Sequence, residues 1–163
     1  IEPLYVGEWT ILNIRPIENI RTGSVPGTLD LMNFEGNNMN WNDIDGNVLF
    51  NKVFPGGIDE IAVFDIKIDR EAATVIISFD LVNELPDNPP PKWIKGYNRC
   101  RCGINCSGVK SLKIDGISTD MLARIEIKKH TNNNEIIIKG RDILLNLTCS
   151  HIQLMGPSVY ISQ

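Results

Sequence analysis

Apolar and polar residues alternate along much of this chain, and the alternation limits the folds that it can form. Phe64, Ile66 and Ile68 are separated by single charged residues, and a second alternating run follows at 75–81. Successive side chains of a β-strand point to opposite faces, so a period of two predicts strands with one buried face. The five residues between the runs, 70–74, form a hairpin turn or a short helical turn.

Turn residues separate several other short apolar runs. Asp45-Gly46 is a strong hairpin signal and lies between the runs 39–43 and 47–54. Lys139-Gly140 plays the same part between 136–138 and 143–145. With further strands expected at 9–14, 28–32, 112–114, 125–128 and 159–161, the sequence predicts about ten short strands and almost no helix. We therefore expect an all-β fold, a single antiparallel β-barrel or sandwich.

The size and composition of the chain fit one globular domain over residues 1–163. The chain has 163 residues, of which 42% are hydrophobic and 22% charged, enough apolar surface to bury a core. The net charge of −4 gives no general attraction to nucleic-acid phosphates. No stretch approaches the roughly 20 apolar residues of a membrane-spanning helix. We expect no nucleic-acid partner and no membrane span.

One segment departs from the strand pattern. Residues 84–92 contain four prolines, which no paired strand tolerates, and a cysteine cluster follows directly. We therefore expect a proline- and cysteine-rich insertion, a loop excursion at 84–110.

Four cysteines suggest a disulfide framework. Cys100, Cys102 and Cys106 lie within seven residues, and Cys149 is far downstream. A direct bond between Cys100 and Cys102 would be strained. Two pairings remain: Cys100–Cys106 with Cys102–Cys149, or Cys100–Cys149 with Cys102–Cys106. A zinc site that adds His151 and a set of free thiols are the alternatives.

Two further features favour a secreted or extracellular protein. The chain starts at Ile1 rather than Met, as a chain freed from a leader would, although a trimmed chain or a fragment would look the same. Asn105 and Asn146 lie in N-glycosylation sequons, each next to a cysteine. We expect a disulfide-stabilised glycoprotein.

Positive charge gathers in the expected insertion. Five Lys and Arg residues, and no Asp or Glu, lie between Lys92 and Lys110. Aromatic residues are interleaved with them, which makes this segment the candidate for binding a protein or glycan partner: Trp93, Lys95, Tyr97, Arg99 and Arg101. The alternative is that Trp93 only packs the loop onto the barrel.

Evidence for catalysis is sparse. None of the common nucleophile, phosphate-binding, dinucleotide-binding or zinc-protease motifs occurs in the chain. Cys149 and His151 are two positions apart on an expected strand and could form a nucleophile pair. Asp65, Asp69 and Asp80 alternate on strand faces, where solvation explains them. We expect no catalytic residues, no metal and no cofactor.

The segment Val6-Gly7-Glu8-Trp9-Thr10-Ile11-Leu12 resembles the Gly-x-Trp start of the calycin families. The following 27–31 segment and the tail at 136–147 resemble META-type domains. This resemblance implies a small, closed or nearly closed β-fold that binds or assembles rather than catalyses. It transfers no functional residue.

Four functions are consistent with these features. The first is a secreted, disulfide-tied, non-catalytic binding or assembly module, with self-association as one mode. The second is a structural subunit of an extracellular or virion assembly. The third is a calycin-like carrier of a small apolar ligand, with Trp9 leading the pocket. The fourth is an enzyme that uses Cys149 and His151.

Overall fold

Nine β-strands form one sheet in the computed structural model, which describes residues 37–163 except 83 and 87. The elements are β1 (Asn37–Asn38), η1 (Trp41–Asp43), α1 (Asn47–Val53), β2 (Glu60–Asp69), β3 (Thr74–Leu81), β4 (Arg99–Ser107), β5 (Ser111–Asp115), β6 (Leu122–Lys129), β7 (Asn134–Gly140), β8 (Leu144–Cys149) and β9 (His151–Tyr160). The predicted strands at 9–14 and 28–32, and the Gly-x-Trp segment, lie outside the described residues.

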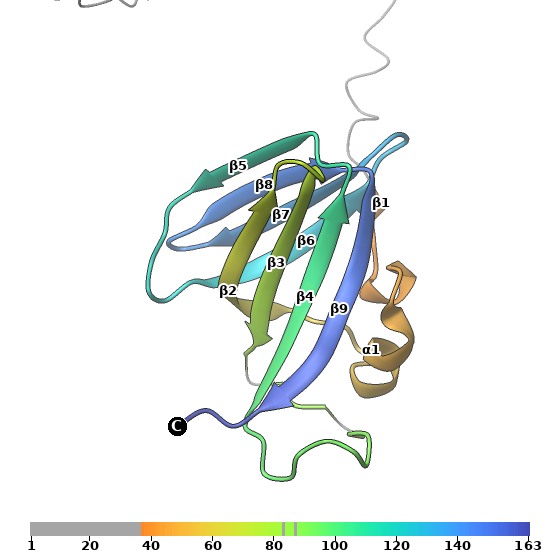
Figure 1. Cartoon of the computed structure of the whole chain (residues 1–163), viewed down its shortest axis with the longest axis vertical. Coiled ribbons are helices and arrows are strands. Elements are labelled where there is room, and N and C mark those ends of the chain that lie inside the picture. The colour runs from red at the N-terminus through yellow and green to blue at the C-terminus, as the bar shows by residue number, and fades with distance from the viewer. Residues whose placement is uncertain (1–36, 83, 87) are drawn as a thin grey trace, which may run out of the picture. The chain divides into compact units, whose positions relative to one another are not determined.

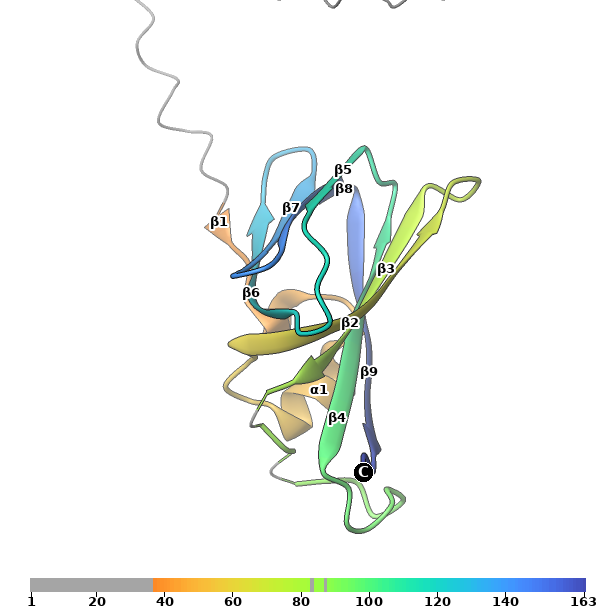
Figure 2. The ribbon, with the colours of Figure 1, turned by 90° about the vertical axis from the view of Figure 1, so that its left-hand side faces the viewer.

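The sheet consists of two halves that are joined where β6 pairs with the start of β2. The strand order is β5-β8-β7-β6-β2-β3-β4-β9, and β1 adds to β6. The start of β2 pairs with β6, while β2 pairs with β3 from Ile61 to Asp69, with one bulge. The sheet folds over at β2, so the half β5–β8–β7–β6 faces the half β2–β3–β4–β9 (Figures 1 and 2). The strand order does not close on itself, so the predicted all-β fold is confirmed as an open, folded-over sheet.

The core lies between the two halves and under α1. Alternate residues of β3, such as Ile77 and Phe79, are fully buried. Ile136 and Leu145 reach the same core cluster from β7 and β8, and Phe50 reaches it from α1. In the described residues, no helix has the length and apolar composition that a membrane crossing requires.

The hairpin predicted around 70–74 is confirmed. Strands β2 and β3 pair in antiparallel register down to Asp69 and Thr74. The Asp69 carboxylate accepts hydrogen bonds from the backbone N–H groups of Glu71 and Ala72, at 3.0 and 3.1 Å. A side chain that bonds to the backbone two residues ahead is the usual chemistry of such turns. The hairpin β7–β8, predicted from Lys139-Gly140, also forms.

The strand predicted at 47–54 is wrong, because this segment forms α1. Gly46 takes a left-handed backbone (φ +85°) and directs the chain into the helix instead of a hairpin. The apolar side chains of Phe50, Val53 and Phe54 are spaced three and four residues apart, so a helix places all three in the core.

The excursion predicted at 84–110 is too long. Residues 99–107 form β4, which lies inside the sheet between β3 and β9. In β4 the buried side chains of Cys100, Cys102, Ile104 and Cys106 occupy every second position, so the cysteines behave as apolar core residues. Only the proline-rich connection before β4 and three residues after it lie outside strands.

We expect Gly46→Ala to lower the free energy of unfolding by about 1–3 kcal/mol. A Cβ at Gly46 would lie 2.7 Å from the backbone oxygen of Leu154, where residue 45 bridges to β9, and the positive φ adds strain. Gly96→Ala is the matched control, because Gly96 has φ +80° but no neighbour within 4 Å of its added Cβ. Urea unfolding should show the larger loss at Gly46, and equal losses would contradict the close approach to β9.

Candidate partner-binding surface

The half β2–β3–β4–β9 has one face turned away from the core, which we call the outer face. Figure 2 shows α1 and strands β6 to β8 on the opposite side of this half. No described helix or strand covers the outer face. Along β3, Ser78 and Asp80 point to it and are half-buried, whereas their neighbours Ile77 and Phe79 are buried inside.

Arg101 is held in place on the outer face by two other strands. Its Nε donates to Asp80 Oδ1 at 2.9 Å, and its Nη2 donates to Asp80 Oδ2 at 3.1 Å. The hydroxyl of Tyr160 accepts a hydrogen bond from Arg101 Nη2 at 3.1 Å and donates to Asp80 Oδ2 at 2.8 Å. Asp80 lies directly opposite Arg101 in the β3–β4 ladder, so the pairing of the strands creates this contact. A two-point Arg–carboxylate pair fixes the orientation of the guanidinium.

Phe64 covers the guanidinium from the solvent side. The Arg101 Cζ lies 3.5 Å from the centre of the Phe64 ring and 4.9 Å from the centre of the Tyr160 ring. A β-bulge between Val63 and Asp65 shifts the register of β2, which leaves Phe64 on the outer face and 57% exposed. Bulges commonly re-aim a side chain in this way. We call these residues the Arg101 cluster: Phe64, Asp80, Arg101 and Tyr160.

Arg101 and Tyr160 keep their usual protonation states at neutral pH. The hydrogen bond with Asp80 is the largest cause of the raised pKa of Arg101. Burial, followed by the hydrogen bond to Asp80, raises the pKa of Tyr160 above its ordinary value. Arg101 therefore stays cationic and Tyr160 stays a neutral phenol, so the cluster presents a fixed set of donors and aromatic surface.

Two acceptor atoms on the same face lack hydrogen bonds within the described residues. These are the buried Oδ1 atoms of Asp65 and Asn105. Asp65 lies opposite Ser78, and Asn105 lies opposite Ile76, so both belong to the outer face. Buried acceptors without partners are costly, and no described group donates to either atom.

The five residues predicted to bind a partner divide between two places. Trp93, Lys95 and Tyr97 lie in the connection before β4, where Trp93 and Tyr97 meet edge to face with ring centres 6.1 Å apart. Trp93 is half-buried against the core cluster, and Lys95 is exposed. Arg99 and Arg101 belong to β4, and only Arg101 joins the cluster on the outer face. Asp80, Phe64 and Tyr160 were not predicted, because the contacts depend on strand register.

The four cysteines are buried thiols in the structure. Cys100, Cys102 and Cys106 point inward from β4, and Cys149 ends β8. Hydrogen bonds join the side chains of Cys100 and Cys102, and those of Cys106 and Cys149. The two pairings predicted from spacing join other cysteines: neither contains a Cys100–Cys102 or a Cys106–Cys149 bond. Disulfide formation itself stays a prediction.

An enzyme that used Cys149 and His151 would need both side chains on one strand face. In the structure they do not share a face. The chain turns at Ser150, between β8 and β9. Cys149 is fully buried, whereas the His151 side chain is 52% exposed and its Nε2 lies 3.2 Å from Asp45 Oδ2. Across the described residues, no three His, Cys, Asp or Glu side chains are grouped to hold a metal ion.

Both predicted glycosylation sites lie within strands. Asn105 is in β4, and Asn146 is in β8, where its Nδ2 donates to Glu135 Oε1 at 2.8 Å. This hydrogen bond is the largest cause of the lowered pKa of Glu135, and the hydrogen bond with His130 lowers that pKa further. Glycosylation stays a prediction, and the hydrogen bond gives Glu135 a structural role.

We expect Glu135→Gln to lower the free energy of unfolding at pH 7 by about 0.5 kcal/mol. Because the folded-state pKa of Glu135 is lowered, its stabilisation is present above the unfolded pKa of about 4.3 and is lost as pH falls through the folded value. Urea unfolding at pH 7 and at pH 3 measures the difference, which should shrink at pH 3. Glu126→Gln, at an exposed position of β6, is the control. A difference that persists at pH 3 would contradict the pairing.

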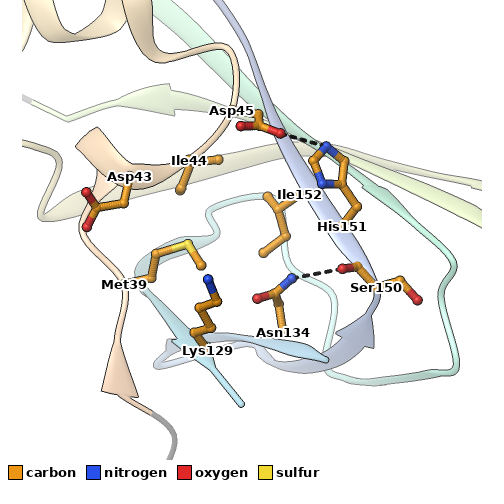
Figure 3. Close-up of a pocket in the computed structure, with 9 residues that line it drawn as sticks. All are labelled: Met39, Asp43, Ile44, Asp45, Lys129, Asn134, Ser150, His151 and Ile152. Carbon is orange, nitrogen blue, oxygen red and sulfur yellow. Dashed lines mark hydrogen bonds and ion pairs between the residues drawn. The ribbon is translucent and has the colours of Figure 1, made fainter. Parts of the chain in front are cut away.

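A pocket lies between the segment 39–45, the adjoining ends of β6 and β7, and the β8–β9 corner (Figure 3). It has a volume of about 240 Å³ and is lined by Met39, Asp43, Ile44, Asp45, Lys129, Asn134, Ser150, His151 and Ile152. Figure 3 shows the pairing of His151 with Asp45 and the hydrogen bond from Asn134 to the backbone oxygen of Ser150. Its polar groups carry both signs of charge, and several are already paired with one another.

The family described as Immunity protein 50 matches residues 48–160. The chain belongs to the Immunity protein 50 family. The Immunity protein 50 segment starts in α1 and ends at Tyr160, so it contains strands β2 to β9 and the whole Arg101 cluster. Met39, Asp43, Ile44 and Asp45 of the pocket precede this segment. The outer face therefore lies wholly within the Immunity protein 50 match, whereas the pocket lies only partly within it.

Among solved structures, this Immunity protein 50 member is similar to an uncharacterized protein from Neisseria gonorrhoeae. The two are 16% identical with a TM-score of 0.43, and the match covers 61% of this chain and 93% of that chain. No curated protein matches the chain. The comparisons bring no support for the resemblance to calycin or META-type domains.

Proposed function

We propose that this protein is an immunity protein that neutralises a partner toxin by binding it directly, without catalysis. The observation that carries this proposal is the family match, which spans α1 and most of the sheet. A family described as immunity proteins implies a protein partner. The separation of Cys149 from His151 also supports binding over chemistry, because it divides the one nucleophile pair that the sequence suggested.

The outer face is the proposed contact surface, and the Arg101 cluster is its centre. Aromatic residues, Met and Arg are enriched in protein interfaces, and Arg and Tyr are common among residues whose loss weakens binding most. Phe64, Arg101 and Tyr160 come together here, with exposed Met155 on the same face. Arg101 is already fixed by Asp80 and Tyr160, so binding costs little additional side-chain entropy.

The experiment uses toxic proteins from the organism that encodes this protein as the candidate partners. Each is expressed in a bacterial host with and without this protein, and growth is measured. The proposal predicts that one of them stops growth alone, that co-expression restores growth, and that the purified pair co-elutes in size-exclusion chromatography. It would be overturned if none of these toxic proteins is neutralised, or if neutralisation occurs while the purified proteins show no complex.

A further inference from the structure

Strands β4 and β8 belong to opposite halves of the sheet, yet their ends meet at the Ser150 corner. The backbone N–H of Ser150 lies 3.0 Å from the backbone oxygen of Ser107 and 3.2 Å from that of Gly108. Ser107 ends β4 and directly follows Cys106, while Ser150 directly follows Cys149. The two hydrogen bonds therefore bring the segments that carry Cys106 and Cys149 together.

The two thiols are neighbours inside the core. Both side chains are fully buried and belong to one core cluster. The hydrogen bond between them raises the pKa of Cys106 and lowers the pKa of Cys149, as expected when the Cys106 S–H donates to the Cys149 sulfur. Cys149 is thus the thiol of the pair that forms a thiolate more readily, and the thiolate is the species that attacks disulfides.

The other two cysteines form a less suitable pair. Cys100 and Cys102 are one residue apart on the same strand, so a bond between them would close a small ring within β4. Disulfide geometry requires specific distances and torsions, and such a ring would strain them. Cys106 and Cys149, which lie on different strands, are therefore the better candidates for a disulfide.

We propose that Cys106 and Cys149 form a disulfide that joins the two halves of the sheet when the protein meets a small oxidised disulfide such as oxidised glutathione. The Cys149 thiolate attacks the glutathione disulfide and releases one glutathione thiolate. Cys106 loses its proton and attacks the mixed disulfide, which releases the second glutathione thiolate. The two protein thiols are oxidised, and one glutathione disulfide is reduced to two molecules of glutathione.

A Cys106–Cys149 disulfide would stabilise the fold by restricting the unfolded chain. Strands β5 to β8 lie between the two cysteines in the sequence, so the bond closes a long loop. Closing a long loop reduces the conformational freedom of the unfolded chain. We expect the oxidised protein to unfold at a Tm about 5–15 °C higher than the reduced protein.

The test incubates the purified full chain with oxidised glutathione, in dilute urea to speed opening of the corner, and maps non-reduced peptides by mass spectrometry. The expected result is one peptide pair joined through Cys106 and Cys149, with Cys100 and Cys102 still reactive toward a thiol reagent. Cys149→Ser should lose both the linked peptide and the Tm increase, while Cys102→Ser keeps both.

Other results of this experiment would overturn the inference. They are a Cys100–Cys102 bond, either pairing predicted from spacing, four thiols that stay reduced, or a linked peptide without a rise in Tm. If Cys149→Ser does not fold, the peptide map of the wild-type chain and its Tm before and after reduction still decide.

Discussion

Arg101→Ala is expected to weaken toxin binding by at least about 30-fold and to remove most of the protection of growth. Residues at the centre of protein interfaces often contribute 2 kcal/mol or more when they are truncated, which corresponds to about that factor. Arg101 combines charge, hydrogen bonds to Asp80 and Tyr160, and stacking on Phe64. Calorimetric titration of the purified toxin measures the change in affinity.

Two further variants separate binding from folding. Arg124→Ala is the matched control, because Arg124 lies on β6 in the other half of the sheet and its side chain is 71% exposed. Phe64→Ala provides independent evidence, since it removes aromatic surface from the outer face while Asp80 keeps its partner. We expect Phe64→Ala to weaken binding as well and Arg124→Ala to leave it unchanged. Wild-type affinity in both Arg101→Ala and Phe64→Ala would exclude the outer face as the contact surface.

The second large effect is expected in the core. Phe79→Ala should lower the free energy of unfolding by about 3–5 kcal/mol, because it leaves a cavity that the surrounding strands cannot fill. Phe79 is 0% exposed on the central strand β3, and its ring centre lies 6.1 Å from that of Trp41. Equilibrium unfolding in urea measures the loss.

An exposed apolar residue serves as the control for that loss. Ile117 is 88% exposed in the connection between β5 and β6. Ile117→Ala should change the free energy of unfolding by no more than about 0.5 kcal/mol, as is usual for surface positions. A similar loss in the two variants would mean that the packing of the two halves around Phe79 is wrong.

The strands could be predicted where alternation is strong, and the exceptions have local causes. The hairpin of β2 and β3 was predicted from its pattern and its turn. The helix α1 was not, because Asp45-Gly46 is typical of a hairpin while Gly46 here begins a helix. The sequence does not predict strand β4, because clustered cysteines suggest cross-links, whereas here they are apolar residues at every second position of a strand.

The candidate site could be predicted only in part. Arg101 was named as a partner-binding residue from the charge and aromatic content of its segment. Asp80 was expected to be a solvated carboxylate, yet the β3–β4 register places it beside Arg101. Tyr160 and Phe64 join the cluster through the pairing of β9 with β4 and through a bulge in β2. Register and bulges depend on tertiary packing, so one sequence without a structure did not reveal these contacts.

The most direct test of the central proposal is to titrate the activity of the purified toxin with this protein. If the protein neutralises by binding, residual toxin activity should fall in proportion to the amount added and reach its minimum at a fixed, stoichiometric ratio. The wild-type chain should show this endpoint, and Arg101→Ala should need a large excess to approach it. Complete inactivation of the toxin by a small fraction of an equivalent would contradict the account, because it would show turnover rather than binding.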